Sequence, residues 1–448
     1  MTKALDSAGG PTMKSLLTVC PLGLAASLFL VGPWLRAASA QLLGPELQVN
    51  TYTTSAQRQS SVAADGSGNF VVVWKSEGGQ DGDFEGVFGQ RFDSAGSNVG
   101  SEFQVNSYTT DYQAQPSVAA DGSGNFVVVW TSSDQDGESN GVFGQRFSSA
   151  GSKVGSEFQV NTYTTSDQKH PAVAASGAGN FVVVWQSNGQ DGSDQGVFAQ
   201  RFNSAGSKVG SELRANTYTT NDQLSPAVAA DGAGNFVVVW HGDDQDGSLF
   251  GVFGQRFDSA GGKVGSEFQV NTYATDNQSY PVAAMIGSGN FVVVWNSSEQ
   301  DGGHYGVFGQ RFDAAGSKVG SEFQVNSFTT DYQRDPGLAA DSSGNFVVAW
   351  GSRDQDGSFA GTIAQRFDSA GGKVGSEIQV NDFTTDSQKV PAVAADGSGN
   401  FVIAWQSNGQ DDDSSYAVIA KQLTIALFAD DFELGDACAW SANVGGGC

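Results

Sequence analysis

Cysteine, histidine and proline are all scarce in this chain of 448 residues, which has three Cys, three His and ten Pro. Only Cys438 and Cys448 follow the first forty residues, so a disulfide between them is expected to staple the tail alone. Basic residues number 22 against 48 acidic ones, and the net charge of -26 argues against a nucleic-acid partner. The sequence has no GxSxG, HExxH, P-loop or CxxC motif, so it lacks the commonest linear signatures of hydrolases, metalloproteases and nucleotide-binding enzymes.

Long apolar runs are also absent after residue 40. Before it, Lys14 precedes an apolar run over residues 16–35, and residues 38–40 (Ala-Ser-Ala) have the small side chains of a signal-peptidase site. We expect residues 1–40 to be a signal peptide, with a retained membrane anchor as the alternative, and no membrane span in the mature chain. The protein is therefore expected to be extracellular or at the cell surface, with the periplasm as another location.

Glycine, by contrast, is abundant at 60 residues, and one unit recurs throughout the chain. A Trp ends a run such as NFVVVW every 55 or 56 residues: Trp74, Trp130, Trp185, Trp240, Trp295, Trp350 and Trp405. Each unit has four segments rich in Val and Phe (PAVAAD, NFVVVW, GVFGQRF and EFQVN), which predict four antiparallel strands with Trp packed between units. Gly-Asn pairs such as Gly68-Asn69 predict tight turns. Arg91 and Glu102, and their equivalents, predict cross-strand ion pairs.

Seven such units predict an all-β fold, a seven-bladed β-propeller of four-stranded antiparallel blades. Residues 46–50 resemble a lone fourth strand, whereas the last unit stops after its third strand at residues 416–423. We therefore expect the N-terminal strand to complete the last blade and close the ring. The propeller is assigned to residues 41–424 and expected to be a monomer, and residues 425–448 form a tail with a sorting or capping role.

The GNFVVVW, QDG and GVFGQRF motifs resemble tandem repeats of secreted bacterial proteins that are compared with the FG-GAP propellers of integrin α-chains. This resemblance covers residues 41–424 and implies a seven-bladed propeller. The loops are shorter and poorer in acid than the DxDxDG calcium loops of FG-GAP propellers, and DGSGNF departs from the Asp-box of sialidases. The resemblance therefore carries over neither calcium binding nor sialidase activity. The tail resembles the FADGFESGD-like ending of exported bacterial proteins, with Asp431 in place of Gly.

Alternating strand directions place the loop after each Trp and the loop that leads into the next blade at the same end of the ring. The first loop carries carboxylates that suit Ca²⁺, the one ion that the sequence suggests: Asp81, Asp134, Asp136, Asp191, Asp244, Asp246, Asp301, Asp354, Asp356 and Asp411. The second loop carries one candidate ligand-binding glutamine in every blade: Gln57, Gln113, Gln168, Gln223, Gln278, Gln333 and Gln388. Hydrogen bonding within turns and between blades is the alternative role of both sets.

His241, beside Asp243 and Asp244, is the histidine best suited to bind a ligand or transfer a proton, and a solvated loop histidine is the alternative. Seven similar loops predict a non-enzymatic scaffold that binds an extracellular glycan or protein ligand at several sites. The other interpretation is a polysaccharide hydrolase or lyase that uses carboxylates around the central channel. Symmetry separates the two: seven equivalent loops favour the scaffold, and an asymmetric pocket favours the enzyme.

Overall fold

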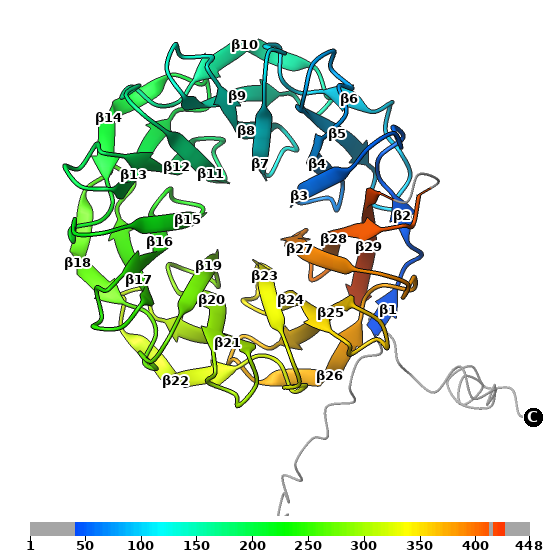
Figure 1. The fold of residues 1–448 in the computed structure, drawn as a ribbon, viewed down its shortest axis with the longest axis vertical. Helices are drawn as coiled ribbons and strands as arrows, with labels where there is room; N and C mark the ends of the chain where they lie inside the picture. Colours follow the sequence, from blue (N-terminus) through cyan, green and yellow to red (C-terminus); the bar gives the residue numbers. More distant parts are fainter. Residues whose placement is uncertain (1–40, 412–414, 426–448) are drawn as a thin grey trace, which may run out of the picture. The chain divides into compact units, whose positions relative to one another are not determined.

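The structure, a computed structural model, describes residues 41–411 and 415–425. These residues form a ring of seven antiparallel blades, each with four strands that succeed one another from the centre outward (Figure 1). The predicted all-β, seven-bladed propeller is confirmed. The predicted signal peptide and the tail with Cys438 and Cys448 lie outside the described residues. Within those residues there is no helix with the length and apolar character needed to span a membrane.

The strands of the first four blades follow the chain in order. Blade 1 has β3 (Gln57–Ala64), β4 (Phe70–Ser76), β5 (Gly86–Phe92) and β6 (Phe103–Gln104). Blade 2 has β7 (Gln113–Ala120), β8 (Phe126–Ser133), β9 (Asn140–Phe147) and β10 (Lys153–Gln159). Blade 3 has β11 (Gln168–Ala175), β12 (Phe181–Asn188), β13 (Gln195–Phe202) and β14 (Lys208–Arg214). Blade 4 has β15 (Gln223–Ala230), β16 (Phe236–Asp243), β17 (Phe250–Phe257) and β18 (Lys263–Gln269).

The last three blades include the one that joins the two ends of the propeller. Blade 5 has β19 (Gln278–Met285), β20 (Phe291–Ser298), β21 (Tyr305–Phe312) and β22 (Lys318–Gln324). Blade 6 has β23 (Gln333–Ala340), β24 (Phe346–Arg353), β25 (Ala360–Phe367) and β26 (Lys373–Gln379). Blade 7 has β27 (Gln388–Ala395), β28 (Phe401–Asn408) and β29 (Tyr416–Ile425), and its outer edge is formed by β1 (Gln41–Leu43) and β2 (Leu47–Gln48).

The hydrophobic core lies between blades rather than within any one of them. Val71 and Val87 of blade 1, for example, pack in one cluster with Val128 and Trp130 of blade 2. The second strand of each blade therefore buries both faces and reads as a continuous apolar run. All seven tryptophans at its end are 0% exposed, which confirms their predicted packing role.

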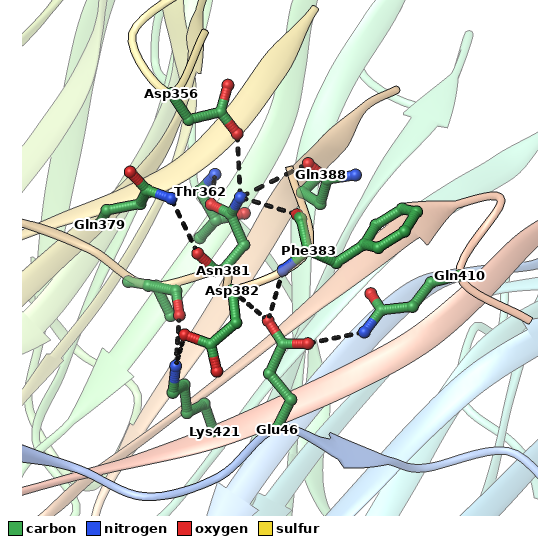
Figure 2. Close-up of polar contacts among 11 residues, drawn as sticks. Glu46, Asp356, Thr362, Gln379, Asn381, Asp382, Phe383, Gln388, Gln410 and Lys421 are labelled. Atoms are coloured by element: carbon green, nitrogen blue, oxygen red, sulfur yellow. Dashed lines mark hydrogen bonds and ion pairs between the residues drawn. The ribbon is translucent and has the colours of Figure 1, made fainter. Parts of the chain in front are cut away.

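One buried asparagine ties each blade to the next. In Figure 2, the Asn381 side chain donates to Asp356 Oδ2 (2.9 Å), to Gln388 Oε1 (3.5 Å) and to the Phe383 carbonyl (3.0 Å). Its Oδ1 accepts the Thr362 N–H at 2.8 Å. The same bonds recur at the equivalent asparagines, so each one satisfies polar groups of two blades in a place that water does not reach.

Replacing one of these asparagines is expected to be costly. Asn216 is 0% exposed, and Asn216→Ala would leave Asp191, Gln223 and the Val197 N–H without the partners they have now. We expect the free energy of unfolding to fall by about 3 kcal/mol or more, measured by urea denaturation. Asn98→Ala, at an exposed turn, is the control and should change it by less than about 0.5 kcal/mol. Equal effects of the two substitutions would contradict the role given to the junction.

Arginine and glutamate also link blades, and the predicted cross-strand ion pair between them is wrong. Arg91 donates to the Ser149 carbonyl of the next blade at 2.8 Å. Glu102 accepts from Gln80 Nε2 at 2.5 Å and from the Thr51 N–H at 2.6 Å. The two side chains therefore serve separate inter-blade contacts, because the outer strand sets the carboxylate against the QDG loop.

Ring closure uses the same contacts with a partner from the other end of the chain. Glu46 takes the place of the repeated glutamate: it accepts from Gln410 Nε2 (2.6 Å) and from the Asp382 N–H (Figure 2). Asn50 Oδ1 accepts the Val418 N–H at 2.8 Å, as the repeated asparagine does elsewhere. The prediction that the N-terminal strand completes the last blade is confirmed.

Candidate functional site

The structure places the predicted glutamines and most of the predicted aspartates in the joints between blades. All seven glutamines are 0% exposed, and each accepts a hydrogen bond from a junction asparagine or, in Gln57, from the Trp74 indole. The aspartate of the QDG motif itself, such as Asp136, accepts a hydrogen bond from the same asparagines, at 3.0 Å from Asn161. Ligand binding stays a prediction for these residues, and hydrogen bonding between blades is the role that the geometry displays.

The first aspartate of the DQDG loops is placed differently from the second. Asp134, Asp244 and Asp354 begin the loop with positive φ, of 56°, 55° and 59°. Asp134, Asp244 and Asp354 lie in blades 2, 4 and 6, in the loop that follows the second strand. Among residues 41–411 and 415–425, no three His, Cys, Asp or Glu side chains come close enough together to hold a metal ion. Ca²⁺ binding therefore stays a prediction, without a carboxylate cluster to carry it.

His241 lies in the interface between blades 4 and 5 and is only 4% exposed. Its Nδ1 accepts the Tyr280 N–H at 3.3 Å, and its ring meets the edge of Phe250 at 4.9 Å between centroids. Burial, with a small contribution from the charge of His170, lowers the pKa of His241 to about 3. The imidazole is therefore neutral at physiological pH and serves as a hydrogen-bond acceptor.

This buried histidine should make stability depend on pH. Between its ordinary pKa of about 6.5 and about 3, the unfolded chain binds a proton that the folded chain refuses, so the free energy of unfolding falls as the pH falls. The loss should reach about 2 kcal/mol at pH 5. His241→Gln should remove it, since Gln186 accepts the equivalent N–H in blade 3, and His304→Gln, at an exposed site, should not. Identical pH profiles of unfolding for wild type and His241→Gln would refute this origin.

A set of residues that differ between blades lies near the central axis. Every innermost strand begins with Gln and carries a β-bulge two residues later, usually followed by Pro. The bulge residue has a positive φ, between 49° and 58°, in all seven blades: Gln59, Gln115, His170, Ser225, Tyr280, Asp335 and Val390. We call these seven positions the bulge ring. Non-glycine residues rarely adopt this conformation, and such strain concentrates at functional sites.

Neighbouring blades hold the bulge ring in place through its backbone. The Asp335 N–H is bonded to Asn296 Oδ1 of blade 5 at 3.1 Å, and the Ser225 N–H to Gln186 Oε1 of blade 3 at 3.1 Å. In blades 2 and 3 the acceptors are the neighbouring bulge residues themselves, since Gln59 and Gln115 supply the oxygens. A neighbouring blade thus holds the bulge backbone in six of the seven blades, while the side chain at this position differs from blade to blade.

The bulge ring does not follow from the repeated motifs, because its residues are the ones that change from unit to unit. The available signal was the opposite: two variable residues between a constant Gln and a nearly constant Pro in each unit. The bulges lie toward the end of the ring that carries the QDG loops, which we call the QDG face. The turns GSGN and their equivalents lie at the other end, which we call the GSGN face. The QDG face is therefore asymmetric around the axis.

Asp335 is the one carboxylate of the bulge ring. Its side chain is 30% exposed, and Arg334 Nε lies 3.7 Å from its Oδ2. Burial raises the pKa of Asp335, against the opposing charges of Arg334 and Lys389. A half-buried carboxyl group with a raised pKa in an accessible place is a candidate proton donor.

Charged side chains extend from Asp335 through blade 7 to blade 1. Lys75 Nζ of blade 1 lies 3.0 Å from Glu77 and 2.9 Å from Glu85. Arg58, also of blade 1, lies 3.7 Å from Glu77. This stretch places a second carboxylate, Glu77, 29% exposed, on the same face as Asp335.

The QDG face also carries the most exposed large apolar side chains in the described part of the chain. These are Phe84 (54%), Tyr112 (47%), Leu249 (48%), Tyr280 (55%) and Phe359 (61%). Phe84 and Tyr112 stack with ring centroids 5.3 Å apart. Exposed aromatic faces beside carboxylates and amides suit the apolar faces and hydroxyl groups of sugars.

A large cavity lies at the opposite end of the ring. It has a volume of about 970 Å³ and is lined by the GSGN turns of several blades, including Asp231 and Asp341. These aspartates are committed to their own turns: Asp341 Oδ1 accepts the Ser343 and Asn345 N–H groups, each at 2.9 Å. Size favours this cavity as the site, but chemistry favours the QDG face, where carboxyl groups remain half exposed, and we give chemistry the greater weight.

No family model matches the sequence, and no curated protein matches it. Among solved structures, a protein of unknown function from Dyadobacter fermentans DSM 18053 is similar at 10% identity with a TM-score of 0.51, over 86% of this chain and 99% of that one. The α-L-arabinanase of Penicillium chrysogenum, solved with arabinobiose, is similar at 11% identity and a TM-score of 0.47, over 85% and 99%. An α-L-arabinofuranosidase of Fusarium graminearum is similar at 10% identity and a TM-score of 0.47, over 87% and 98%.

The likeness to the Dyadobacter fermentans protein, at 10% identity, shows a shared fold alone, and an activity has to be argued from the residues. Several of the similar structures are arabinofuranosidases, an arabinanase or another glycoside hydrolase. The expectation of a non-enzymatic scaffold is contradicted, and the hydrolase alternative is argued below from the residues of the QDG face. The chain is thus a seven-bladed β-propeller with an asymmetric QDG face.

Proposed function

We propose that this protein is a glycoside hydrolase that cleaves an oligosaccharide bound on the QDG face, with Asp335 as the proton donor. The observation that carries the proposal is the single carboxylate of the bulge ring, whose pKa burial raises. Hydrolysis of a glycosidic bond needs an acid that still holds its proton near neutral pH, and burial is the usual means of keeping it.

The second carboxylate that such a reaction needs is assigned to Glu77. It is 29% exposed and lies 3.0 Å from Lys75 Nζ. In this role Glu77 takes a proton from water or attacks the sugar itself, on the side of the substrate opposite Asp335. Tyr280 and the other exposed aromatic residues of the QDG face supply stacking surfaces for the sugar rings.

Two further proposals accompany this one. The N-terminal segment supports export, so we propose that the substrate is met outside the cytoplasm. A distant relation to FG-GAP propellers is also proposed, on the motifs of the repeat alone.

The decisive experiment is a digestion of a polysaccharide panel in water enriched in ¹⁸O. A hydrolase adds one labelled oxygen to the product for each bond cleaved, which mass spectrometry of the released oligosaccharides detects. A lyase leaves an unsaturated, unlabelled product and would replace the hydrolase assignment. No cleavage of any member of a panel that includes arabinan, other plant glycans and bacterial polysaccharides would overturn the proposal.

A further inference from the structure

The lysines and arginines of the described chain fall into two groups. Most occupy two repeated positions: Arg91, Arg146, Arg201, Arg256, Arg311, Arg366, Lys153, Lys208, Lys263, Lys318 and Lys373. The others do not recur in this way: Lys75, Arg214, Arg353 and Lys421 have no cationic counterpart in another blade, and one further position is cationic in four of the seven blades, with Arg58, Lys169, Arg334 and Lys389. The first group belongs to the repeated contacts between blades. The second group lies outside those repeated contacts, so its positive charge needs a different explanation.

Six of this second group lie on the two innermost strands at the QDG end, and five of those six belong to the consecutive blades 6, 7 and 1. The five are Arg334, Arg353, Lys389, Arg58 and Lys75. Such a gathering is unexpected in a chain with a net charge of -26, because random placement would spread so few cations around the ring. The bulge-ring carboxylate Asp335 lies in the same three blades.

Two of these cations converge on one aromatic ring. The Arg58 guanidinium carbon, from blade 1, lies 4.5 Å from the centre of the Tyr416 ring, and Lys389 Nζ, from blade 7, lies 5.4 Å from the same centre. Tyr416 begins β29, the third strand of blade 7. Two positive charges beside one ring repel each other, so an anion bound near both lowers the free energy of the arrangement.

The nearby carboxylates do not neutralise both Arg58 and Lys389. Glu77 lies 3.7 Å from Arg58 Nε but is shared with Lys75 at 3.0 Å. Within the part of the chain that the structure describes, Lys389 Nζ forms no ion pair, and no hydrogen bond satisfies the buried Arg58 Nε. A cation-rich place with unused donors is suited to a ligand that brings one negative charge of its own.

We infer that the QDG face binds an acidic oligosaccharide, one whose sugar carries a carboxylate, and that Arg58 and Lys389 receive this carboxylate beside Asp335. This inference rests on the proposed glycan-directed function and names its substrate class. A guanidinium offers a planar pair of donors that matches a carboxylate, and Lys389 adds a point charge. Glu77, Glu85 and Asp335 leave the surroundings with little surplus positive charge, which suits a singly charged carboxylate better than a phosphate.

The test is isothermal titration of the full chain with uronic-acid oligosaccharides, each beside its carboxyl-reduced form, which has the same linkages and no charge. The panel contains oligogalacturonate, oligomannuronate and hyaluronan fragments, and a sulfated dextran fragment represents the other anionic chemistry. At least one uronate should bind ten times or more tightly than its reduced form. Equal affinity for the two forms, binding to sulfated dextran alone, or binding to no acidic oligosaccharide would overturn the inference.

The double variant Arg58→Gln with Lys389→Gln should lose at least tenfold in affinity for the uronate and keep its affinity for the reduced form. These positions hold Ala114, Leu224 and Ser279 in other blades, so the fold tolerates the change. Arg214→Gln, an exposed cation on an outer strand, is the matched control and should bind as the wild type does. Unchanged uronate affinity in the double variant would refute the assignment of Arg58 and Lys389.

Binding and cleavage are scored separately, so the two proposals can fail independently. A uronate that binds tightly through Arg58 and Lys389 but is never cleaved would support the proposed binding of acidic oligosaccharides and contradict the proposed hydrolase activity. Cleavage of a neutral glycan, with no preference for the charged form in binding, would support the hydrolase activity and contradict the proposed binding of acidic oligosaccharides.

Discussion

Deletion of residues 41–50 is expected to open the ring and lower the free energy of unfolding by about 5 kcal/mol or more, a large share of the ~5–15 kcal/mol typical of folded proteins. The deletion removes the buried Val49, whose N–H is bonded to the Val418 carbonyl at 2.9 Å. It also removes Asn50, which accepts the Val418 N–H, and Glu46, which accepts from Gln410. Thermal unfolding followed by circular dichroism would measure the loss.

The deleted strand also offers a rescue experiment. Without β1 and β2, the outer edge of β29 exposes unpaired N–H and C=O groups, and such edges recruit other chains. A synthetic peptide with the sequence of residues 41–50 should raise the melting temperature and suppress aggregation, and a peptide with Asn50→Ala should do so less well. A truncated protein that melts like the full chain, with no response to the peptide, would show that closure contributes little.

Asp335→Asn is expected to lower the rate of glycan cleavage about 100- to 10,000-fold, the usual contribution of a positioned acid. The amide has the same shape and cannot supply the proton. Wild-type activity should fall as the pH rises through the raised pKa of Asp335, and this limb should be missing from the residual activity of the variant. The measurement is the pH dependence of kcat/KM on the best substrate of the panel.

Ser225→Ala is the matched control for this substitution. Ser225 occupies the same bulge position in blade 4, with a φ of 49° and an equivalent backbone hydrogen bond. Its removal should leave both the melting temperature and the rate nearly unchanged. If Asp335→Asn cleaves glycan as fast as the wild type, Asp335 is not the acid.

The sequence was sufficient for the fold because the fold is periodic. Trp74 and its six equivalents mark every blade, and the unmatched strand at residues 46–50 indicates how the ring closes. Each of these features follows from a residue pattern and a strand count. Neither requires knowledge of which side chains meet across the ring.

The candidate site could not be predicted in the same way. Asp136 and Gln168 recur in every blade, so they attract attention, yet recurrence here reflects the junction with Asn161 that every blade needs. Asp335 is unremarkable in the sequence, where it lies between an arginine and a proline. Its candidate role as a proton donor depends on the bulge, on the bond to Asn296 of another blade and on burial. All three are properties of the assembled ring.

Closure by the N-terminal strand has a consequence for the order in which the protein folds. Residues 41–50 are made first, but their partner β29 is made last, some 375 residues later. At a synthesis rate of roughly 5–20 residues per second, the first strand waits about 20–75 s for the strand it must join. Blades 1 to 6 contain all their own strands and can form during that interval. The seventh blade can be finished only once β29 has been made, so its assembly is the last step in the formation of the ring.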